Sequence, residues 1–257
     1  MVGRRSIVRP GVRQAEICDL VARFEEVSVK TLAAKYTTSE ETIRRDLSLL
    51  ADAGRVQKVH GGARRVARID EGAFDERMGQ NLLAKRLIAE KVAKLVAPRQ
   101  TIFMDTGSTT LICAEAMART KSLTVITNSA RISATFAAGT GGAQVFLLGG
   151  LFRGDNAQTV GPTTIREIGY YRTDHAIITA GTLRAEGAYD YSYSEAQVAR
   201  AMIAAASEIT VVVDHSKFER DATHKLCNLD QIDNLISDKR PNDALADALH
   251  RANVAQL

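Results

Sequence analysis

Small and hydroxyl-bearing residues follow the apolar run TIFM at positions 101–104, where the sequence continues as DTGSTT from Asp105. Backbone N–H groups at the start of a helix bind anions, and glycine lets an anion approach closely. We therefore interpret Gly107, Ser108, Thr109 and Thr110 as a tight, phosphate-binding turn into a helix. A Gly-Ser-Thr sequence after a strand is also a common helix cap, so a purely structural role is the alternative.

Further polar residues follow other apolar runs. Asn128 follows one such run, Gly149 and Gly150 follow the next with Arg153 just beyond, and Lys217 comes shortly after a later one. In open α/β sheets, ligands bind at the carboxyl ends of the strands, where these residues are expected to meet. Arg153 is a natural clamp for a phosphate because its guanidinium can bind two oxygens at once.

Six short apolar runs alternate with helical patterns between residues 101 and 237. Continuous β-rich runs of this length indicate strands that are buried on both faces. We predict an α/β domain with a mainly parallel sheet. Its strands are expected at 101–104, 123–127, 144–148, 175–179, 209–213 and 234–237, and its helices at 82–97, 109–119, 129–138 and 194–207.

The N-terminal part has a different pattern. Ile17, Val21 and Phe24 lie on one face of a first helix, and a short second helix is expected at 29–36. A third helix covers about 40–53, and the alternating residues after it predict a β-ribbon that turns at a double glycine. Three helices followed by a ribbon describe a winged helix-turn-helix.

The third helix is the candidate for DNA recognition. Ile43, Leu47 and Leu50 pack against the other helices, so the polar residues point elsewhere. A helix of this size fits the major groove, while basic residues on the ribbon meet phosphates. The predicted DNA-contacting residues are Thr38, Ser39, Thr42, Arg44, Arg45, Ser48, Arg55, Lys58, His60 and Gly61. Two adjacent arginines on a helix are, alternatively, solvated surface positions.

The ends of this third helix have their own signals. Ser39 is the predicted N-cap, and Thr38 with Glu41 forms an alternative capping box one residue earlier. Gly54 is placed to end the helix in a left-handed conformation.

The distribution of charge also separates the N-terminal part of the chain from the rest. Residues 1–68 carry 14 Lys and Arg against 8 Asp and Glu, whereas the other 189 residues carry 20 against 22. A basic segment joined to a slightly acidic one suggests a polyanion-binding module with a second role attached. We predict a DNA-binding domain at 1–66, an irregular linker at 67–81 and a ligand-sensing domain at 82–257.

The remaining features exclude several classes of protein. No apolar run is long enough to span a membrane, and the basic N-terminus lacks the apolar core of a secretory signal. Three scattered cysteines fit reduced thiols in a cytoplasm, and none has metal-ligand spacing. We expect no metal and no cofactor.

The N-terminal segment TIRRDLSLLADAGRVQKVHGGA resembles the signature of the DeoR family of transcriptional regulators. The resemblance implies operator DNA as a partner, and most members of the family repress. A single winged helix binds weakly, so a dimer or tetramer is expected.

The C-terminal part resembles the same family through D-x-G-[ST]-T, TN-[SN], GG and D-x-SKF patterns. The segments DYSYSEAQVARAM and VVVDHSKFERDA look most like its glycerol-3-phosphate repressor branch. The resemblance implies a fold similar to ribose-5-phosphate isomerase and a phosphorylated sugar or polyol as effector. The residues carried over to the pocket are Asp105, Gly107, Ser108, Thr109, Asn128, Gly149, Gly150 and Lys217.

Glu195 decides between a regulator and an enzyme. Isomerases of this fold keep a carboxylate base at such a position, but a helix N-terminus also favours Glu for its dipole alone. An isomerase needs a lysine beside that base, and the segment 179–195 contains only Arg184 as a base. We therefore predict a binding protein, with an isomerase-like enzyme carrying a DNA-binding module as the alternative. A nucleotide-binding domain ranks last because no complete GxGxxG follows a strand.

Overall fold

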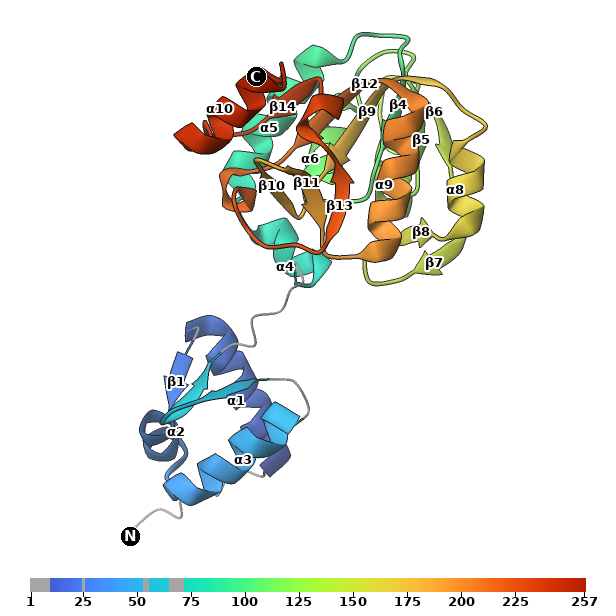
Figure 1. Ribbon diagram of the computed structural model, residues 1–257. Coiled ribbons are helices and arrows are strands. Elements are labelled where there is room, and N and C mark those ends of the chain that lie inside the picture. The colour runs from blue at the N-terminus through green and yellow to red at the C-terminus, as the bar shows by residue number, and fades with distance from the viewer. Residues whose placement is uncertain (1–9, 25, 53–55, 65–71) are drawn as a thin grey trace. The chain divides into compact units, whose positions relative to one another are not determined.

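The computed structural model describes residues 10–24, 26–52, 56–64 and 72–257. The chain divides into two compact units, Met1–Arg68 and Ile69–Leu257, which are drawn in Figure 1. No helix among the described residues is long and apolar enough to cross a membrane.

The N-terminal unit is a winged helix-turn-helix, as predicted. Its helices are α1 (Pro10–Phe24), α2 (Val29–Tyr36) and α3 (Glu40–Asp52). The strands β1 (Glu26–Ser28), β2 (Gln57–Val59) and β3 (Gly62–Arg64) form an antiparallel sheet in the order β1-β3-β2. The sequence predicted β2 but not β1, which has only three residues.

The core of this unit is formed by the helical faces expected from the sequence. Ile17, Val21, Ile43 and Leu47 are all at most 1% exposed. Phe24 was expected on the same face but is 59% exposed, because it is the last residue of α1 and lies beyond the packed part of the helix. Gly54, the predicted helix stop, lies outside the described residues.

A buried ion pair joins α1 to α3. Arg13 Nε donates to Asp46 Oδ2 at 2.6 Å, and Gln14 Nε2 donates to Asp46 Oδ1 at 2.8 Å. The two charged side chains are 7% and 6% exposed. Because a buried charge is costly unless it is paired, this contact fixes the angle between the two helices.

The C-terminal unit contains a seven-stranded sheet in the order β15-β14-β12-β9-β4-β5-β6, and every neighbouring pair is parallel. All six predicted strands are present. They are β4 (Thr101–Met104), β5 (Thr124–Thr127), β6 (Gln144–Leu147), β9 (Thr173–Thr179), β12 (Ala206–Val212) and β14 (Asn234–Ile236). The added edge strand, β15 (Ala255–Gln256), is only two residues long.

Helices cover both faces of this sheet (Figure 1). One face packs on α5 (Leu82–Leu95), α6 (Ser108–Met117) and α7 (Ala130–Ala138). The other packs on α8 (Pro162–Ile168), α9 (Tyr193–Ala205) and α10 (Asp243–Arg251). Along β4 the side chains alternate, since Phe103 belongs to the second core and its neighbours Ile102 and Met104 to the first.

Two small antiparallel sheets were not predicted. One pairs β7 (Leu151–Arg153) with β8 (Gln158–Val160). The other has the order β10-β11-β13, built from β10 (Thr182–Arg184), β11 (Gly187–Asp190) and β13 (His224–Cys227). Two short 3-10 turns, at His215–Lys217 and Leu229–Gln231, complete the unit.

The predicted linker contains a helix. Residues 64–80 have no clear hydrophobic period, yet the structure places α4 at Phe74–Gly79. Phe74 is 3% exposed and belongs to the core shared by α5, α6 and α7. The expectation of an irregular segment is therefore wrong for α4, because a single buried aromatic residue anchors a helix too short to show a period.

Candidate functional site

The start of α3 is held by the predicted cap. Ser39 Oγ accepts a hydrogen bond from Thr42 N at 3.2 Å and lies 2.9 Å from Thr42 Oγ1. Both hydroxyls therefore serve the helix end, and Thr38, the alternative start, lies outside the helix. All three residues are at least partly exposed.

Arg44 and Arg45 lie on the exposed face of α3. Arg44 donates to Glu40 at 2.8 Å and lies 3.8 Å from Glu41, which is also 3.8 Å from Arg45. Exposed ion pairs of this kind contribute about 0–1 kcal/mol. Exchanging them for DNA phosphates or base edges therefore costs little.

A hydrogen bond joins α3 to the ribbon. Lys58 Nζ of β2 donates to Ser48 Oγ at 3.0 Å, and Ser48 in turn donates to Arg44 O at 2.9 Å. His60 and Gly61 form the turn between β2 and β3, where Gly61 has a φ of +80°. Arg55 lies outside the described residues. The described residues of the predicted DNA surface lie on α3, just before it, or on the ribbon that is bonded to it, but their contact with DNA stays a prediction.

In the C-terminal unit, Asp105 joins the ends of two strands. Both of its carboxylate oxygens accept a hydrogen bond from Thr179 N at 3.1 Å, at the end of β9. Asp105 also lines a small cavity together with Asp190 and Glu195. Carboxylates accept hydrogen bonds from hydroxyl groups. No group of three acidic, His or Cys side chains among the described residues is arranged to hold a metal ion.

Gly107 has a different role from the expected tight turn. Its φ of −170° is extended backbone that any residue adopts. A side chain there would, however, bring Cβ to 2.4 Å from Thr179 Cγ2. Glycine is therefore required by the close approach of β9, and the expectation that it makes the turn possible is wrong.

A buried lysine reaches the first residue of α6. Lys85 Nζ of α5 donates to Ser108 Oγ at 2.9 Å and also to the carbonyl of Arg77. Lys85 is 3% exposed and Ser108 6%. An ammonium group at a helix N-terminus adds a full charge to the dipole and the free N–H groups, which is the arrangement that binds an anion.

The two threonines of α6 differ. Thr109 is 4% exposed, and its hydroxyl has no hydrogen-bond partner among the described residues. Thr110 is fully buried and donates to Gly107 O at 3.1 Å. The structure therefore leaves Thr109 near the predicted anion position, whereas the Thr110 hydroxyl serves the helix cap.

Asn128 and Glu195 both line the cavity. Asn128 accepts from Thr106 Oγ1 at 3.2 Å and donates to Gln158 at 3.3 Å. Glu195, at the start of α9, accepts from Asn156 Nδ2 at 3.2 Å. The enclosed space between these groups is barely large enough for one water molecule, so a larger ligand must displace one of them.

The other predicted effector residues are not brought to this cavity. Gly149 N donates to Glu167 at 2.7 Å, and Gly150 packs so closely on Thr164 that a side chain would clash. The double glycine thus serves the packing of α8. Arg153 is exposed on β7 and pairs with Asp155 at 3.3 Å. Arg153 is therefore not among the residues that line the cavity, and its role as a phosphate clamp stays a prediction.

Lys217 lies in a 3-10 turn after β12, outside the lining of the small cavity. Its carbonyl accepts from Thr182 Oγ1 at 2.8 Å, which fixes the turn against β10. In the same turn Asp214 is 1% exposed and accepts from Asn81 Nδ2 at 2.9 Å. Lys217 therefore lies near the end of β12 as expected, but it does not line the cavity, and its contact with an effector stays a prediction.

Sequence reasoning missed Lys85, Asp190 and Gln158. A signal for Lys85 was present, because it lies on the face of α5 that also carries Ile88, Ala89 and Val92 at helical spacing. A lysine on a buried face requires a polar partner. Asp190 and Gln158 come from the two small sheets, so their position could not follow from strands that were not predicted.

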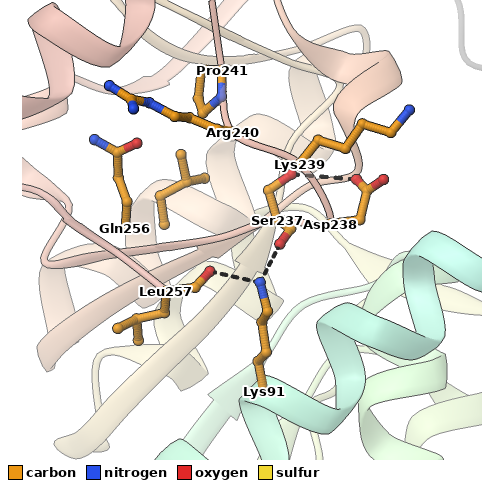
Figure 2. A pocket seen from close by; sticks show the side chains of 9 residues that line it. Lys91, Ser237, Asp238, Lys239, Arg240, Pro241, Gln256 and Leu257 are labelled. Carbon is orange, nitrogen blue, oxygen red and sulfur yellow. Dashed lines mark hydrogen bonds between the residues drawn. The ribbon is translucent and has the colours of Figure 1, made fainter.

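A larger cavity of about 410 Å³ lies elsewhere (Figure 2). It is lined by Lys91, by residues that follow β14 and by the last two residues, and none of the predicted effector residues lines it. Lys91 Nζ donates to Ser237 O at 2.8 Å and to Leu257 O at 3.1 Å. Figure 2 shows Lys239 and Arg240 pointing in different directions, so the basic groups do not converge on one ligand position.

The carboxylate of Asp238, at the edge of this cavity, already accepts hydrogen bonds from within the protein. Burial raises the pKa of Asp238, but hydrogen bonds from His215 N at 2.8 Å and His215 Nδ1 at 2.7 Å outweigh it, so the pKa lies below its ordinary value. The carboxylate is thus ionised and paired.

Each of the two units matches a known protein domain. Residues 13–68 match the DeoR-like helix-turn-helix domain, and residues 80–239 match the DeoR C terminal sensor domain. The chain is 30% identical to the HTH-type transcriptional repressor CsqR of Escherichia coli, over 94% of this chain and 93% of that protein. It is 31% identical to the glycerol-3-phosphate regulon repressor of Haemophilus influenzae, over 91% of each chain.

Among solved structures, ribose 5-phosphate isomerase A from Methanocaldococcus jannaschii has 18% identity and a TM-score of 0.39, over 54% of this chain and 55% of that one. The curated relatives are transcriptional repressors, so the predicted class, a regulator rather than an enzyme, is confirmed. With a matching DNA-binding domain and a matching sensor domain, the chain belongs to the DeoR family of transcriptional regulators.

Proposed function

We propose that this protein represses an operon for carbohydrate or polyol catabolism in the cytoplasm, and that a phosphorylated sugar or polyol controls its affinity for the operator. The family assignment and the repressors among the relatives support the DNA-binding half of the proposal. The relatives named for glycerol 3-phosphate make that compound the first effector to test.

The observation that carries the effector half is Lys85 at the start of α6. Its ammonium lies 2.9 Å from Ser108 Oγ, at a helix end that offers free N–H groups. A phosphate placed there receives a full positive charge, backbone donors and the hydroxyls of Ser108 and Thr109. A buried cation needs polar groups around it, and the Ser108 hydroxyl and the Arg77 carbonyl are two of those that contact Lys85.

The rest of the ligand would extend into the acidic cavity. Asp105, Asp190 and Glu195 line it, with Asn128 and Gln158 beside them. Carboxylates repel a phosphate but accept hydrogen bonds from hydroxyls, so the two regions suit the two ends of a sugar phosphate. We infer that the phosphate lies at Lys85 and the hydroxyls at the acids.

The decisive experiment is fluorescence anisotropy of the full chain on labelled DNA from upstream of its own gene cluster. Glycerol 3-phosphate, erythritol phosphate and several pentose and hexose phosphates would be titrated into the complex, with the unphosphorylated parents as controls. We expect one phosphate to change operator affinity and its parent to have no effect. A protein that binds the operator but responds to none of the phosphates would contradict the effector half.

Matched variants locate the phosphate. Lys85→Met should weaken effector binding at least about tenfold, since a charged hydrogen bond contributes roughly 1.5–3 kcal/mol. Lys94→Met removes an exposed lysine from the same helix and should leave the response unchanged. Equal behaviour of both variants would remove Lys85 from the site.

Self-association is part of the same proposal. Leu83 and Leu87 are 78% and 50% exposed on α5, and Leu151 and Phe152 are 67% and 57% exposed on β7. Exposed apolar residues of this kind are typical of surfaces that bind another protein. We expect a dimer or tetramer in light scattering coupled to gel filtration, and a monomer would contradict this.

A further inference from the structure

Arg77 of α4 is buried beside the candidate effector site. It is 7% exposed, and its guanidinium carbon lies 5.4 Å from the centre of the Phe74 ring. Its Nη2 donates to Asn156 Oδ1 at 3.0 Å. Asn156 lies between β7 and β8, so a residue of the helix that follows the inter-unit connection holds a residue of a distant loop.

Asn156 also contacts Glu195, a residue that lines the cavity. Its Nδ2 donates to Glu195 Oε1 at 3.2 Å, while its Oδ1 accepts from Arg77. The two ends of one amide are thus fixed by a cation and a carboxylate. Since Glu195 lines the cavity, Arg77 is a positioning residue that acts on the cavity through Asn156.

The same stretch of chain contacts the site at two more points. Lys85 bonds both the carbonyl of Arg77 and the hydroxyl of Ser108 at the start of α6. Asn81 donates to Asp214 at 2.9 Å and to Ser216 at 3.1 Å, in the turn after β12. Residues 74–85, which we name the contact segment, therefore touch three separate elements around the candidate site.

In chain order, the contact segment is the first described part of the C-terminal unit after the connection to the DNA-binding unit. We propose that the relay Arg77–Asn156–Glu195 transmits occupancy of the effector site to α4, and through α4 to the DNA-binding unit. This inference rests on the proposed function, because it requires a ligand in that site.

The physical reason is competition for Glu195. A ligand hydroxyl that bonds this carboxylate takes the oxygen that Asn156 now uses, and the enclosed space admits no sugar unless a side chain moves. When Asn156 turns away, Arg77 Nη2 loses the hydrogen bond to Asn156 Oδ1. A phosphate at Lys85 accepts a hydrogen bond from the same ammonium group that donates to the Arg77 carbonyl, and so competes with that carbonyl. Both ends of the ligand thus weaken contacts that fix α4, and α4 takes a second position.

The test measures coupling and binding separately in the full chain. The coupling factor is the ratio of operator Kd values with and without the sugar phosphate that gives the largest wild-type response, starting with glycerol 3-phosphate. Arg77→Met keeps an apolar stem against Phe74 but cannot hold Asn156. We expect it to reduce the coupling factor about fivefold or more, out of the roughly 5–150-fold usual for such systems. Operator affinity without effector, and effector affinity of the free protein, should stay within about threefold.

Asn156→Ala breaks the same relay from its other side. It should give the same loss of coupling, and the double variant should lose no more, since two residues acting through one contact are not additive. Full additivity of the two losses would overturn the relay.

Arg131→Met is the matched control. Arg131 lies 4.1 Å from the centre of the same Phe74 ring but pairs with Asp75 at 3.1 Å. It should therefore respond like the wild type. An equal loss in Arg131→Met, or full coupling in Arg77→Met, would overturn the relay alone. A wild-type protein that responds to no sugar phosphate would overturn the proposed function, and the relay with it.

Discussion

On α3 of the DNA-binding unit, Arg44 and Arg45 are 54% and 80% exposed, and their ion-pair partners among the described residues are Glu40 and Glu41 of the same helix. Around α6 of the sensor unit, Lys85 and Ser108 are almost completely buried and bonded to each other across two helices. One polar surface can exchange partners without any change in the fold. The other cannot take up a ligand unless buried contacts are rearranged.

This difference fits the division of labour in a regulator. Operator binding needs accessible cations whose present partners are weak and screened by salt. Effector sensing needs a site where binding changes the structure, because a ligand shifts an equilibrium only through different affinities for two states. In the proposed effector site, buried, directional contacts such as those of Lys85 would supply that difference, and exposed ones would not.

The largest expected effect comes from the Arg13–Asp46 pair of the DNA-binding unit. Unlike the exposed ion pairs of α3, this pair is buried. Asp46→Ala removes the buried carboxylate to which Arg13 and Gln14 both donate, so we expect about 3–5 kcal/mol of lost stability. That is a large share of the roughly 5–15 kcal/mol that holds a small domain together. Urea unfolding followed by circular dichroism should show the N-terminal unit melting early, and operator binding should be lost.

The control for this prediction replaces both partners. The double variant Arg13→Met with Asp46→Leu removes both charges and fills similar volume, so it should recover most of the stability. Unfolding of Asp46→Ala within about 1 kcal/mol of the wild type would show that the pair does not organise α1 and α3.

A smaller effect is expected where the sensor unit is tightly packed. Gly107→Ala places Cβ at 2.4 Å from Thr179 Cγ2, and Thr179 is held by Asp105 through its N–H and by Val212 through its hydroxyl. Overpacking of this kind costs about 1–3 kcal/mol. We expect a lower unfolding midpoint and a weaker effector response, with operator binding retained.

Thr179→Ser tests the cause, since it removes Cγ2 and keeps the hydroxyl. Added to Gly107→Ala, it should restore most of the lost stability. If the double variant is no more stable than Gly107→Ala alone, the clash with Thr179 is not the reason for the glycine.

Gly107 also illustrates what sequence can and cannot predict. Six of the seven strands of the sheet follow from the sequence because strands buried on both faces are continuous apolar runs, and Ile102 to Met104 is such a run. That glycine begins α6 was also evident. The reason for it was not, because the contact with Thr179 joins residues 72 positions apart.

The candidate site was predictable only in part. Asp105, Ser108 and Asn128 follow predicted strands and meet at one edge of the sheet. Lys85 and Arg77 come from helices before the first strand, where strand ends carry no information. Arg153 looked like a phosphate clamp because it follows a double glycine, but it lies on the unpredicted strand β7, pairs with Asp155 and does not line the cavity. Local pattern thus places residues at strand ends, whereas partners from other layers require the fold.

For the exposed surface, the predicted effect is on DNA binding alone. Arg44→Ala or Arg45→Ala should weaken operator binding by about 1–3 kcal/mol if the residue reads a base, and reduce the salt dependence if it contacts a phosphate. Stability should change by no more than about 0.5 kcal/mol, as is usual for surface positions. Anisotropy titrations at several salt concentrations distinguish the two modes. Unchanged affinity in both variants would remove them from the DNA surface.

Glu41→Gln sharpens this test in the opposite direction. Glu41 lies 3.8 Å from both arginines, so removing its charge frees Arg45 from this pair, leaves Arg44 paired with Glu40, and lowers repulsion of DNA phosphates. We expect operator affinity to rise about two- to threefold, in line with the few tenths of a kcal/mol of an exposed pair. A fall in affinity would mean that the ion pairs orient the arginines for DNA.

The last prediction needs no mutation and compares the thiol reactivity of the two units. Cys18 of α1 is half-buried, whereas Cys113 of α6 and Cys227 of β13 are buried. Burial, with the nearby Asp105 carboxylate, raises the pKa of the Cys113 thiol, and burial raises that of Cys227 to about 11. Because the thiolate is the reactive form, two pKa units mean about 100-fold less of it near neutral pH. One thiol should therefore react with a disulfide reagent in the native protein and all three in urea, with mass spectrometry assigning the first to Cys18. Early labelling of Cys113 would show that α6 opens readily without effector, and the contrast between a fixed sensor site and a free DNA surface would fail.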